Sequence, residues 1–231
     1  MTITSIIFDY DGTLIDSIPA HKRAIRKVAK KHGIIITEEA FARYNGMSTK
    51  EGFGSIMREH HITFGAIRIA WEMRKEKKSI HEHINIYPDT KRTLERLEKR
   101  YALAIATSSN KAYLRKTLER FPIKEHFKAF TTANDVRHTK PSPAIFLKAA
   151  SKLSAEPEAC VVIEDSMNGV IAAKRAGMSV IAILTTTDKA LFVGEAAPDA
   201  FITSLDELTE TTIKQAAANA AIRRQTTREE L

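Results

Sequence analysis

Hydrophobic residues in this chain form short, nearly unbroken runs that are separated by segments with helical periodicity. We expect the runs to form strands, at residues 3–8, 102–107, 129–132, 160–163, 179–182 and 200–202. Runs without polar alternation are typical of strands that are buried on both faces of a parallel sheet. The intervening segments predict helices at residues 90–100, 111–120, 143–153 and 167–176. This order predicts an open α/β sheet with right-handed crossovers.

One connection between strands is much longer than the others. Residues 14–87 contain helical patterns but no convincing strand, and such a length exceeds an ordinary crossover. We predict that residues 15–86 form a helical cap domain, inserted above the C-terminal end of the sheet. Its first helix is expected to begin with Asp16 or Ser17 as N-cap and with Pro19 in its first turn.

The rest of the chain divides around this insertion. Residues 1–14 and 87–210 are expected to form the catalytic core. Residues 211–231 contain an alanine run and a polar end. They predict a C-terminal tail that is either a loose helix or disordered.

The positive charge of the chain is concentrated in the predicted cap. The chain has a net charge of +8, and residues 15–86 hold 14 Lys or Arg against 8 Asp or Glu, which accounts for six of the excess charges. A basic segment attracts an anion such as a phosphorylated small molecule, unless its lysines simply solvate exposed helix faces. No DNA- or RNA-binding motif accompanies this charge, so we expect no nucleic-acid partner.

Cysteine content and hydropathy bear on the compartment. Cys160 is the only cysteine, and no apolar run approaches the roughly 18 residues of a membrane span. We therefore expect a cytoplasmic protein without a membrane partner, as a monomer or a weak homodimer.

Two acidic side chains follow the first predicted strand. Asp9 and Asp11 lie in the segment FDYDGT, at the strand end where an open α/β sheet usually binds its ligand. Gly12 can turn the chain here, so one of the two acids can bind through its backbone. Two acids this close repel each other unless a proton or a cation lies between them, and Mg²⁺ prefers oxygen ligands. The pair by itself is also compatible with a solvated turn.

Three further polar motifs follow other predicted strands. Thr107 and Ser108 begin a TSSN segment whose hydroxyls and N–H groups suit a phosphate, although a helix N-cap has the same composition. Lys140 precedes a Pro-Ser-Pro helix start, where a fixed ammonium can hold a phosphate or a carboxylate. Glu164 and Asp165 end an apolar strand, and a metal ion is the natural partner of two such acids. Together these motifs predict one site at the edge of the sheet.

The chain resembles the haloacid dehalogenase-like hydrolase superfamily in four motifs, FDYDGTL, ATSS, KPSP and VIEDSMNGVIAAKRAG. The resemblance covers residues 3–208, and it is to the branch that contains β-phosphoglucomutase, phosphoglycolate phosphatase and small sugar-phosphate phosphatases. It implies a Rossmann-like parallel sheet core with an inserted helical cap, and Mg²⁺ as the cofactor.

The resemblance also implies a role for each motif residue. Asp9 corresponds to the nucleophile that forms an aspartyl-phosphate, and Asp11 corresponds to the general acid/base. Thr107 and Lys140 correspond to the groups that orient the phosphate. The implied magnesium ligands are a carboxylate oxygen of Asp9, the backbone carbonyl of Asp11, and the side chains of Glu164 and Asp165.

Details within the motifs favour one reaction of the superfamily. Its dehalogenases lack the second aspartate, so the presence of Asp11 favours phosphoryl transfer, and the Schiff-base lysine of its phosphonatases cannot be assigned. His21 stands where β-phosphoglucomutase has a histidine, but many phosphatases share that histidine, and a packing role on its helix is equally open. Asn45 replaces a basic residue of the mutase. We therefore expect a phosphatase for a small phosphorylated substrate, a sugar phosphate, with β-phosphoglucomutase as the alternative.

The cap is expected to complete the substrate site. Gly46 and Ser48 lie in a segment that resembles the substrate-contacting loop of the superfamily, and closure would bring them and basic cap residues onto the substrate. A third hypothesis is a non-catalytic protein that binds a metabolite. The intact set of carboxylates argues against it.

Overall fold

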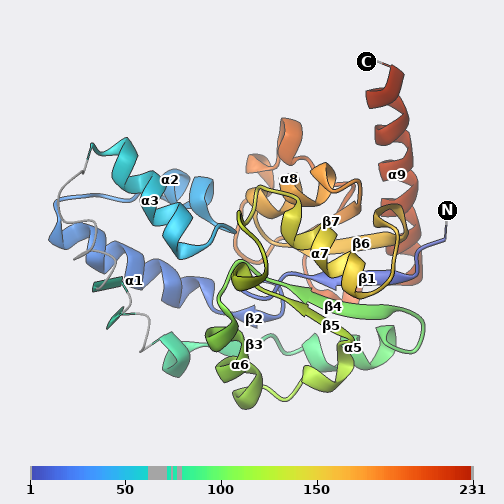
Figure 1. The fold of residues 1–231 in the computed structure, drawn as a ribbon, viewed down its shortest axis with the longest axis horizontal. Helices are drawn as coiled ribbons and strands as arrows, with labels where there is room; N and C mark the ends of the chain where they lie inside the picture. Colours follow the sequence, from blue (N-terminus) through green and yellow to red (C-terminus); the bar gives the residue numbers. More distant parts are fainter. Residues whose placement is uncertain (1, 62–71, 74, 77–79, 230–231) are drawn as a thin grey trace.

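The computed structural model describes residues 2–61, 72–73, 75–76 and 80–229 (Figure 1). The described chain has a six-stranded sheet in the order β5-β4-β1-β6-β7-β8, and all of its strand pairs are parallel. The strands are β1 Ser5–Phe8, β4 Ala102–Ala106, β5 Ala129–Thr131, β6 Cys160–Glu164, β7 Ser179–Ile183 and β8 Ala200–Ile202. Each lies close to a predicted apolar run, and the predicted α/β class is confirmed.

Helices cover both faces of the sheet. The strand β1 is wholly buried, and because side chains alternate along a strand, Ile6 and Phe8 belong to one apolar cluster while Ile7 belongs to the other. Helices α5 Thr90–Leu97, α6 Lys111–Arg120 and α9 Glu210–Glu229 pack into the first cluster. Helices α7 Ala144–Lys152 and α8 Met167–Arg175 pack into the second.

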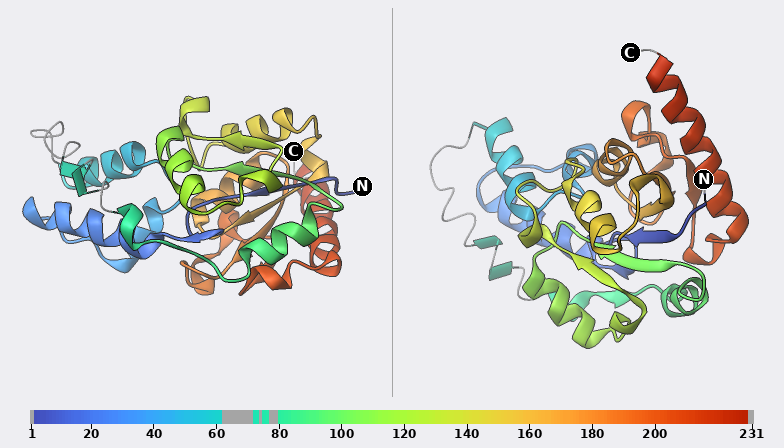
Figure 2. Two further views of the ribbon diagram at one scale, coloured as in Figure 1. Left: turned by 90° about the horizontal axis from the view of Figure 1, so that it is seen from below. Right: turned by 45° about the vertical axis from the view of Figure 1, so that its right-hand side comes forward.

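A separate group of helices forms the cap. These are α1 Ile18–Lys31, α2 Glu38–Tyr44 and α3 Thr49–Glu59, and a short 3₁₀ helix, Ile80–His83, leads back to the core. The cap has its own apolar cluster, which includes Val28, Phe41 and Phe53. Figures 1 and 2 show the cap at one end of the sheet and α9 at the other.

The expectation that residues 14–87 contain no strand is wrong in one respect. Strands β2 Ile15–Asp16 and β3 Asn85–Ile86 pair antiparallel where the chain leaves and re-enters the core. Two residues are too few to leave a periodic pattern in the sequence. The limits of the cap at residues 15 and 86 stay a prediction.

The start of α1 also differs from the expected N-cap. Ser17 occupies the N-cap position, but its side chain makes no capping hydrogen bond. Its Oγ instead donates to Oδ1 of Asp11 at 2.7 Å. The Ser17 hydroxyl therefore binds a carboxylate of the core instead of capping α1.

The C-terminal segment contains a packed helix. Ile213, Ala216 and Ala220 of α9 are buried. Arg223 forms an ion pair with Asp199, with Nε 3.0 Å from Oδ1. Among the described residues, no helix has both the length and the apolar character that crossing a membrane requires.

Candidate active site

Three buried carboxylates meet at the C-terminal ends of β1 and β6. Phe8 is level with Ile163 in the parallel register, so Asp9 comes next to Glu164 and Asp165. One carboxylate oxygen from each of these acids lies within 4.8 Å of the other two. Asp9, Glu164 and Asp165 are 4%, 0% and 2% exposed, so little water is available to screen their repulsion.

Lys140 completes this cluster from the loop before α7. Its ammonium is buried and forms ion pairs with Asp9 and with Glu164, the second at 2.5 Å. Burial alone would lower the pKa of Lys140, but the two carboxylates outweigh it and raise that pKa, so the ammonium stays charged. Three carboxylates and one ammonium leave two negative charges.

These residues fit a magnesium ion. Burial, together with the neighbouring acids, raises the pKa of Asp9 to about 7, with Lys140 opposing, and burial also raises the pKa of Asp165. A divalent cation would balance the two remaining charges, and carboxylate oxygens are the ligands that Mg²⁺ prefers. The structure thus brings together three of the four predicted ligands. The backbone carbonyl of Asp11 as the fourth stays a prediction.

Two glycines let the backbone approach these carboxylates. Gly12 has a φ of +85°, and a Cβ there would lie 2.3 Å from Oδ2 of Asp165. A Cβ on Gly169 in α8 would lie 1.8 Å from Oε1 of Glu164. The same carboxylate accepts from the Ser166 N–H at 2.7 Å, so the start of α8 fixes its orientation. Larger residues at either glycine would collide with the acid cluster.

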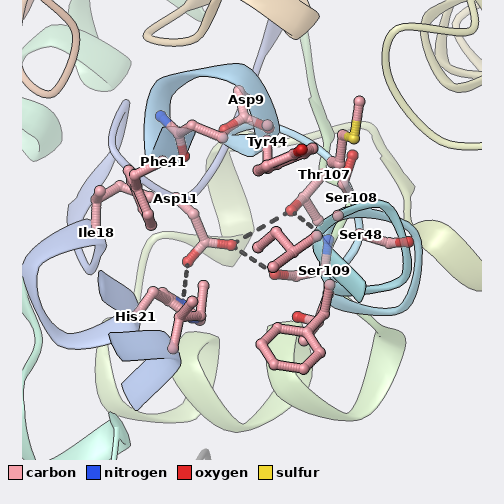
Figure 3. Close-up of a pocket in the computed structure, with 18 residues that line it drawn as sticks. Asp9, Asp11, Ile18, His21, Phe41, Tyr44, Ser48, Thr107, Ser108 and Ser109 are labelled. Carbon is pink, nitrogen blue, oxygen red and sulfur yellow. Dashed lines mark hydrogen bonds and ion pairs between the residues drawn. The ribbon is translucent and has the colours of Figure 1, made fainter. Parts of the chain in front are cut away.

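Asp11 lies beside the acid cluster in a different environment. Its carboxylate accepts hydrogen bonds from Ser17 Oγ at 2.7 Å, Ser109 Oγ at 2.6 Å and the Tyr113 hydroxyl at 2.8 Å. The ring of His21 lies 3.5 Å from Oδ1, and Figure 3 shows His21 and Ser109 converging on this carboxylate. Burial by itself would raise the pKa of Asp11, but these contacts outweigh it and hold that pKa below its usual value. The Asp11 carboxylate thus has hydrogen-bond partners other than those of the cluster formed by Asp9, Glu164 and Asp165.

The sequence reasoning missed most of the groups around Asp11. Tyr113 carries no motif signal, although it lies in the first turn of α6, which Asn110 caps. Its ring also contacts His21, with centroids 5.7 Å apart. Ser17 was assigned only as a helix cap. A hydroxyl close to a predicted catalytic acid is the sole sequence signal that could have identified it.

The TSSN segment places hydroxyls at the end of β4. Asn110, the fourth residue, takes the capping role, because its side chain accepts from the Tyr113 N–H at 2.9 Å. The Oγ1 of Thr107 accepts from Ser109 N–H at 3.0 Å and lies 3.5 Å from Oδ2 of Asp11. The Ser108 hydroxyl is buried and has no hydrogen-bond partner among the described residues. The segment therefore holds an N-cap and also polar groups that a phosphate could use.

The predicted cap loop rests on the core. Asn168 of α8 donates to the carbonyl oxygens of Arg43 at 2.8 Å and Asn45 at 2.7 Å. Gly46 has a φ of +85°, and a Cβ there would lie 2.2 Å from Oγ of Ser166. Asn45 also lies close to the acid cluster, with Nδ2 3.4 Å from Oδ2 of Asp165. The loop is thus fitted closely to the start of α8.

A second contact joins the cap to the loop that carries Lys140. The Ser48 N–H donates to Oγ1 of Thr139 at 3.0 Å, and the Thr139 N–H donates to Oε1 of Glu51 at 3.2 Å. The Ser48 hydroxyl donates to Oε2 of Glu51 at 2.6 Å. Glu51 and Thr139 were not predicted, because their contact spans 88 positions of the chain. Substrate contacts by Gly46 and Ser48 remain predictions.

A cavity of about 90 Å³ lies between the cap and the core (Figure 3). Seven of the predicted site residues line it: Asp9, Asp11, His21, Gly46, Ser48, Thr107 and Ser108. Lys140, Glu164 and Asp165 are not among its lining residues. The volume is well below the roughly 300–1,000 Å³ of pockets that enclose drug-sized ligands, so a metabolite would require the cap to move.

Comparison with known proteins gives matches over most of the chain. The family of haloacid dehalogenase-like hydrolases matches residues 6–183, which confirms the resemblance in the four motifs. The phosphorylated carbohydrates phosphatase of Thermotoga maritima is 34% identical over 176 residues, 75% of this chain and 82% of that protein. The fructose-1-phosphate phosphatase of Escherichia coli is 29% identical over 177 residues, 76% of this chain and 94% of that protein.

Solved structures share the fold. The crystal structure of β-phosphoglucomutase from Clostridium difficile superposes with a TM-score of 0.81 and 23% identity, over 96% of this chain and 100% of that one. Identity at this level supports a common fold and nothing finer.

Proposed function

The chain belongs to the haloacid dehalogenase-like hydrolase family, and we propose that it is a Mg²⁺-dependent phosphatase of a small phosphorylated metabolite, a sugar phosphate. The observation that carries the proposal is the buried cluster of Asp9, Glu164, Asp165 and Lys140 beside Asp11. Relatives named for phosphorylated carbohydrates and for fructose 1-phosphate support the sugar part.

The metal would be held by Asp9, Glu164 and Asp165. When bound there, Mg²⁺ supplies positive charge that offsets the charge of the phosphate dianion. Lys140 contributes a second positive charge and holds the Asp9 carboxylate through its ion pair. A carboxylate can approach a phosphate dianion only where such charges reduce their repulsion.

Phosphoryl transfer would then proceed in two steps. In the first, a carboxylate oxygen of Asp9 forms a bond to phosphorus, the bond from phosphorus to the ester oxygen breaks, and Asp11 gives its proton to the departing alkoxide. In the second, water attacks the aspartyl-phosphate, Asp11 takes a proton from that water, and Asp9 is regenerated as inorganic phosphate departs. The hydrogen bonds around Asp11 stabilise its ionised form, which accepts the proton in the second step, whereas the first step requires the protonated form that these hydrogen bonds disfavour.

Thr107 and Ser108 would orient the phosphate. They lie at the end of β4 and line the same cavity as Asp9 and Asp11. Closure of the cap over this cavity keeps bulk water from the first step.

The nucleophile assignment is tested with Asp9→Asn. We expect the variant to lose Mg²⁺-dependent hydrolysis of p-nitrophenyl phosphate, because an amide cannot form the acyl phosphate. Asp206→Asn, an exposed side chain that pairs with Arg92, serves as the control and should retain activity. Retention of most activity by Asp9→Asn would show that another group attacks phosphorus.

A β-phosphoglucomutase is the second candidate, because His21 lies 3.5 Å from Asp11, at the position where that enzyme also has a histidine. Incubation with β-glucose 1-phosphate and a trace of the bisphosphate separates the two. Release of free phosphate supports the phosphatase, and formation of glucose 6-phosphate supports the mutase.

A further inference from the structure

Among the described residues, the cap presents no Lys, Arg, Asp or Glu to the cavity. Its lining combines apolar side chains with the polar residues His21, Tyr44, Asn45, Ser48 and Thr49. Ile18 and Ile25 lie seven residues apart, on one face of α1, and both line the cavity. Phe41 of α2 and Phe53 and Ile56 of α3 line it as well. Three helices thus direct apolar side chains toward the space above Asp9 and Asp11.

Several described basic residues of the cap form ion pairs away from the cavity. Lys22 and Arg26 form ion pairs with Glu38, whose side chain is 64% exposed. Farther along α1, Lys27 pairs with Glu76 at 2.9 Å. The side chain of Arg43 pairs with that of Glu59 at 2.8 Å, and both side chains are about half exposed. These four basic side chains therefore pair with acids of the cap, and none of the four lines the cavity.

The one basic side chain among the described lining residues, His21, contacts residues of the core. Among the described lining residues there is no Lys or Arg. His21 lies in the wall between Ile18 and Ile25, but its Nε2 is 3.5 Å from Asp11 and 3.3 Å from the Tyr113 hydroxyl. The His21 ring therefore contacts Asp11 and Tyr113 on the core side of the cavity.

This wall has a consequence for the rest of the substrate. A carboxylate or a second phosphate beyond the reacting phosphate would lie against apolar and uncharged polar side chains and near two aspartates, with no Lys or Arg among the described lining residues to balance its charge, and burying an unpaired charge is costly. An uncharged alcohol carries no such penalty. We propose that the enzyme selects monophosphate esters of uncharged alcohols and excludes substrates that carry a second anionic group. The proposal rests on the phosphatase function and narrows its substrate class.

Two matched pairs of substrates test the selection. The first is α-glucose 1-phosphate against α-glucuronate 1-phosphate, which share the ring and the ester position. The second is 2-hydroxyethyl phosphate against phosphoglycolate. We expect kcat/KM with Mg²⁺ to be at least tenfold higher for the neutral member of each pair. Equal or better turnover of an anionic member overturns the proposal, and so does failure to hydrolyse both neutral members while p-nitrophenyl phosphate is hydrolysed.

A charge placed on the wall provides an independent test. Met47 lines the cavity, and Met47→Lys adds an ammonium on an unbranched side chain of similar length. We expect it to raise the ratio of anionic to neutral kcat/KM at least tenfold. Ile35→Lys is the matched control, because Ile35 is 83% exposed on the cap and the variant gains the same charge there. Equal shifts in the two variants would assign the effect to overall charge and overturn the proposal.

Two outcomes need separate treatment. If Met47→Lys does not fold, Ile25→Lys places the charge on α1 in the same wall. If the unaltered protein hydrolyses none of these esters, including p-nitrophenyl phosphate, then the phosphatase function itself fails. That result differs from hydrolysis without selection, which overturns the selectivity alone.

Discussion

Arg223→Ala should show how far the C-terminal helix contributes to the stability of the core. The guanidinium holds Asp199 through two contacts of 3.0 Å, and it also donates to the Met178 carbonyl at 3.0 Å. The Asp199 side chain is only 3% exposed, whereas that of Arg223 is 23% exposed. After the substitution, the Val180 N–H at 2.8 Å is the remaining described donor to that carboxylate.

The expected loss follows from this burial. Removing one partner of a buried ion pair costs about 3–5 kcal/mol, and the partial exposure of Arg223 favours the lower end, about 3 kcal/mol. For a chain of this length, 1 kcal/mol corresponds to roughly 2–4 °C in Tm. We therefore expect Tm to fall by about 6–12 °C, measured by circular dichroism, with urea unfolding as a second measure of the free energy of unfolding.

A control variant and a double-mutant cycle separate the buried ion pair from the general effect of removing an arginine. Arg115→Ala removes an arginine that is 79% exposed and lies 3.8 Å from Glu119, and we expect a change within about 0.5 kcal/mol. In an Asp199→Asn background, Arg223→Ala should cost less, because no buried charge is left behind. If Arg223→Ala costs no more than Arg115→Ala, then the buried pair does not hold α9 to the core.

Further outcomes can be checked at the active site. Tyr113→Phe removes a hydroxyl that holds Asp11, so kcat/KM for an alkyl phosphate should fall about tenfold more than for p-nitrophenyl phosphate, whose leaving group needs no proton; equal losses would contradict the assignment. In metal-free protein, burial raises the pKa of Asp9 to about 7, so the native state binds more protons than the unfolded state between about pH 4 and 7, and stability should fall as pH rises through this range. Thermal unfolding in EDTA should therefore give a lower Tm at pH 8 than at pH 5.5, and Mg²⁺ should stabilise most at pH 8; a pH-independent Tm in EDTA would contradict this. Gly169→Ala should destabilise the protein by more than about 2 kcal/mol, because its Cβ would lie 1.8 Å from a buried carboxylate oxygen, whereas a Cβ on Gly54 in α3 would meet only the end of the Arg58 side chain at 3.5 Å. Similar losses of Tm in Gly169→Ala and Gly54→Ala would contradict the clash.

The sequence predicted the buried strands and the acidic side chains that follow them. Apolar runs identified the buried strands, and the parallel register of β1 and β6 brings Asp9 level with Glu164. Acids at the ends of two such strands therefore become neighbours without further information. Asp9, Glu164 and Asp165 could be named as candidate metal ligands from their places at strand ends and from the family resemblance, and the register then brings them together.

Contacts between side chains that are far apart in the sequence could not be predicted in this way. The Tyr113 hydroxyl reaches Asp11 across 102 positions, and Thr139 reaches Glu51 across 88. Neither pair leaves a periodic signal, since the first depends on how α6 lies against the end of β1 and the second on how the cap lies on the core. The direction of the cap charges was likewise hidden, because composition counts lysines without showing which acids, such as Glu38, are beside them.

The small β2–β3 ladder has a mechanical consequence for this enzyme. Ile15 pairs with Ile86, and the Tyr87 N–H donates to the Leu14 carbonyl at 3.2 Å. The Thr90 hydroxyl donates to the same carbonyl at 2.9 Å. The two segments that connect the core to the cap, residues 14–16 and 85–90, are therefore hydrogen-bonded to each other. We expect them to act as one hinge when the cap moves. A substitution in either connecting segment should thus alter the movement of the whole cap relative to the core.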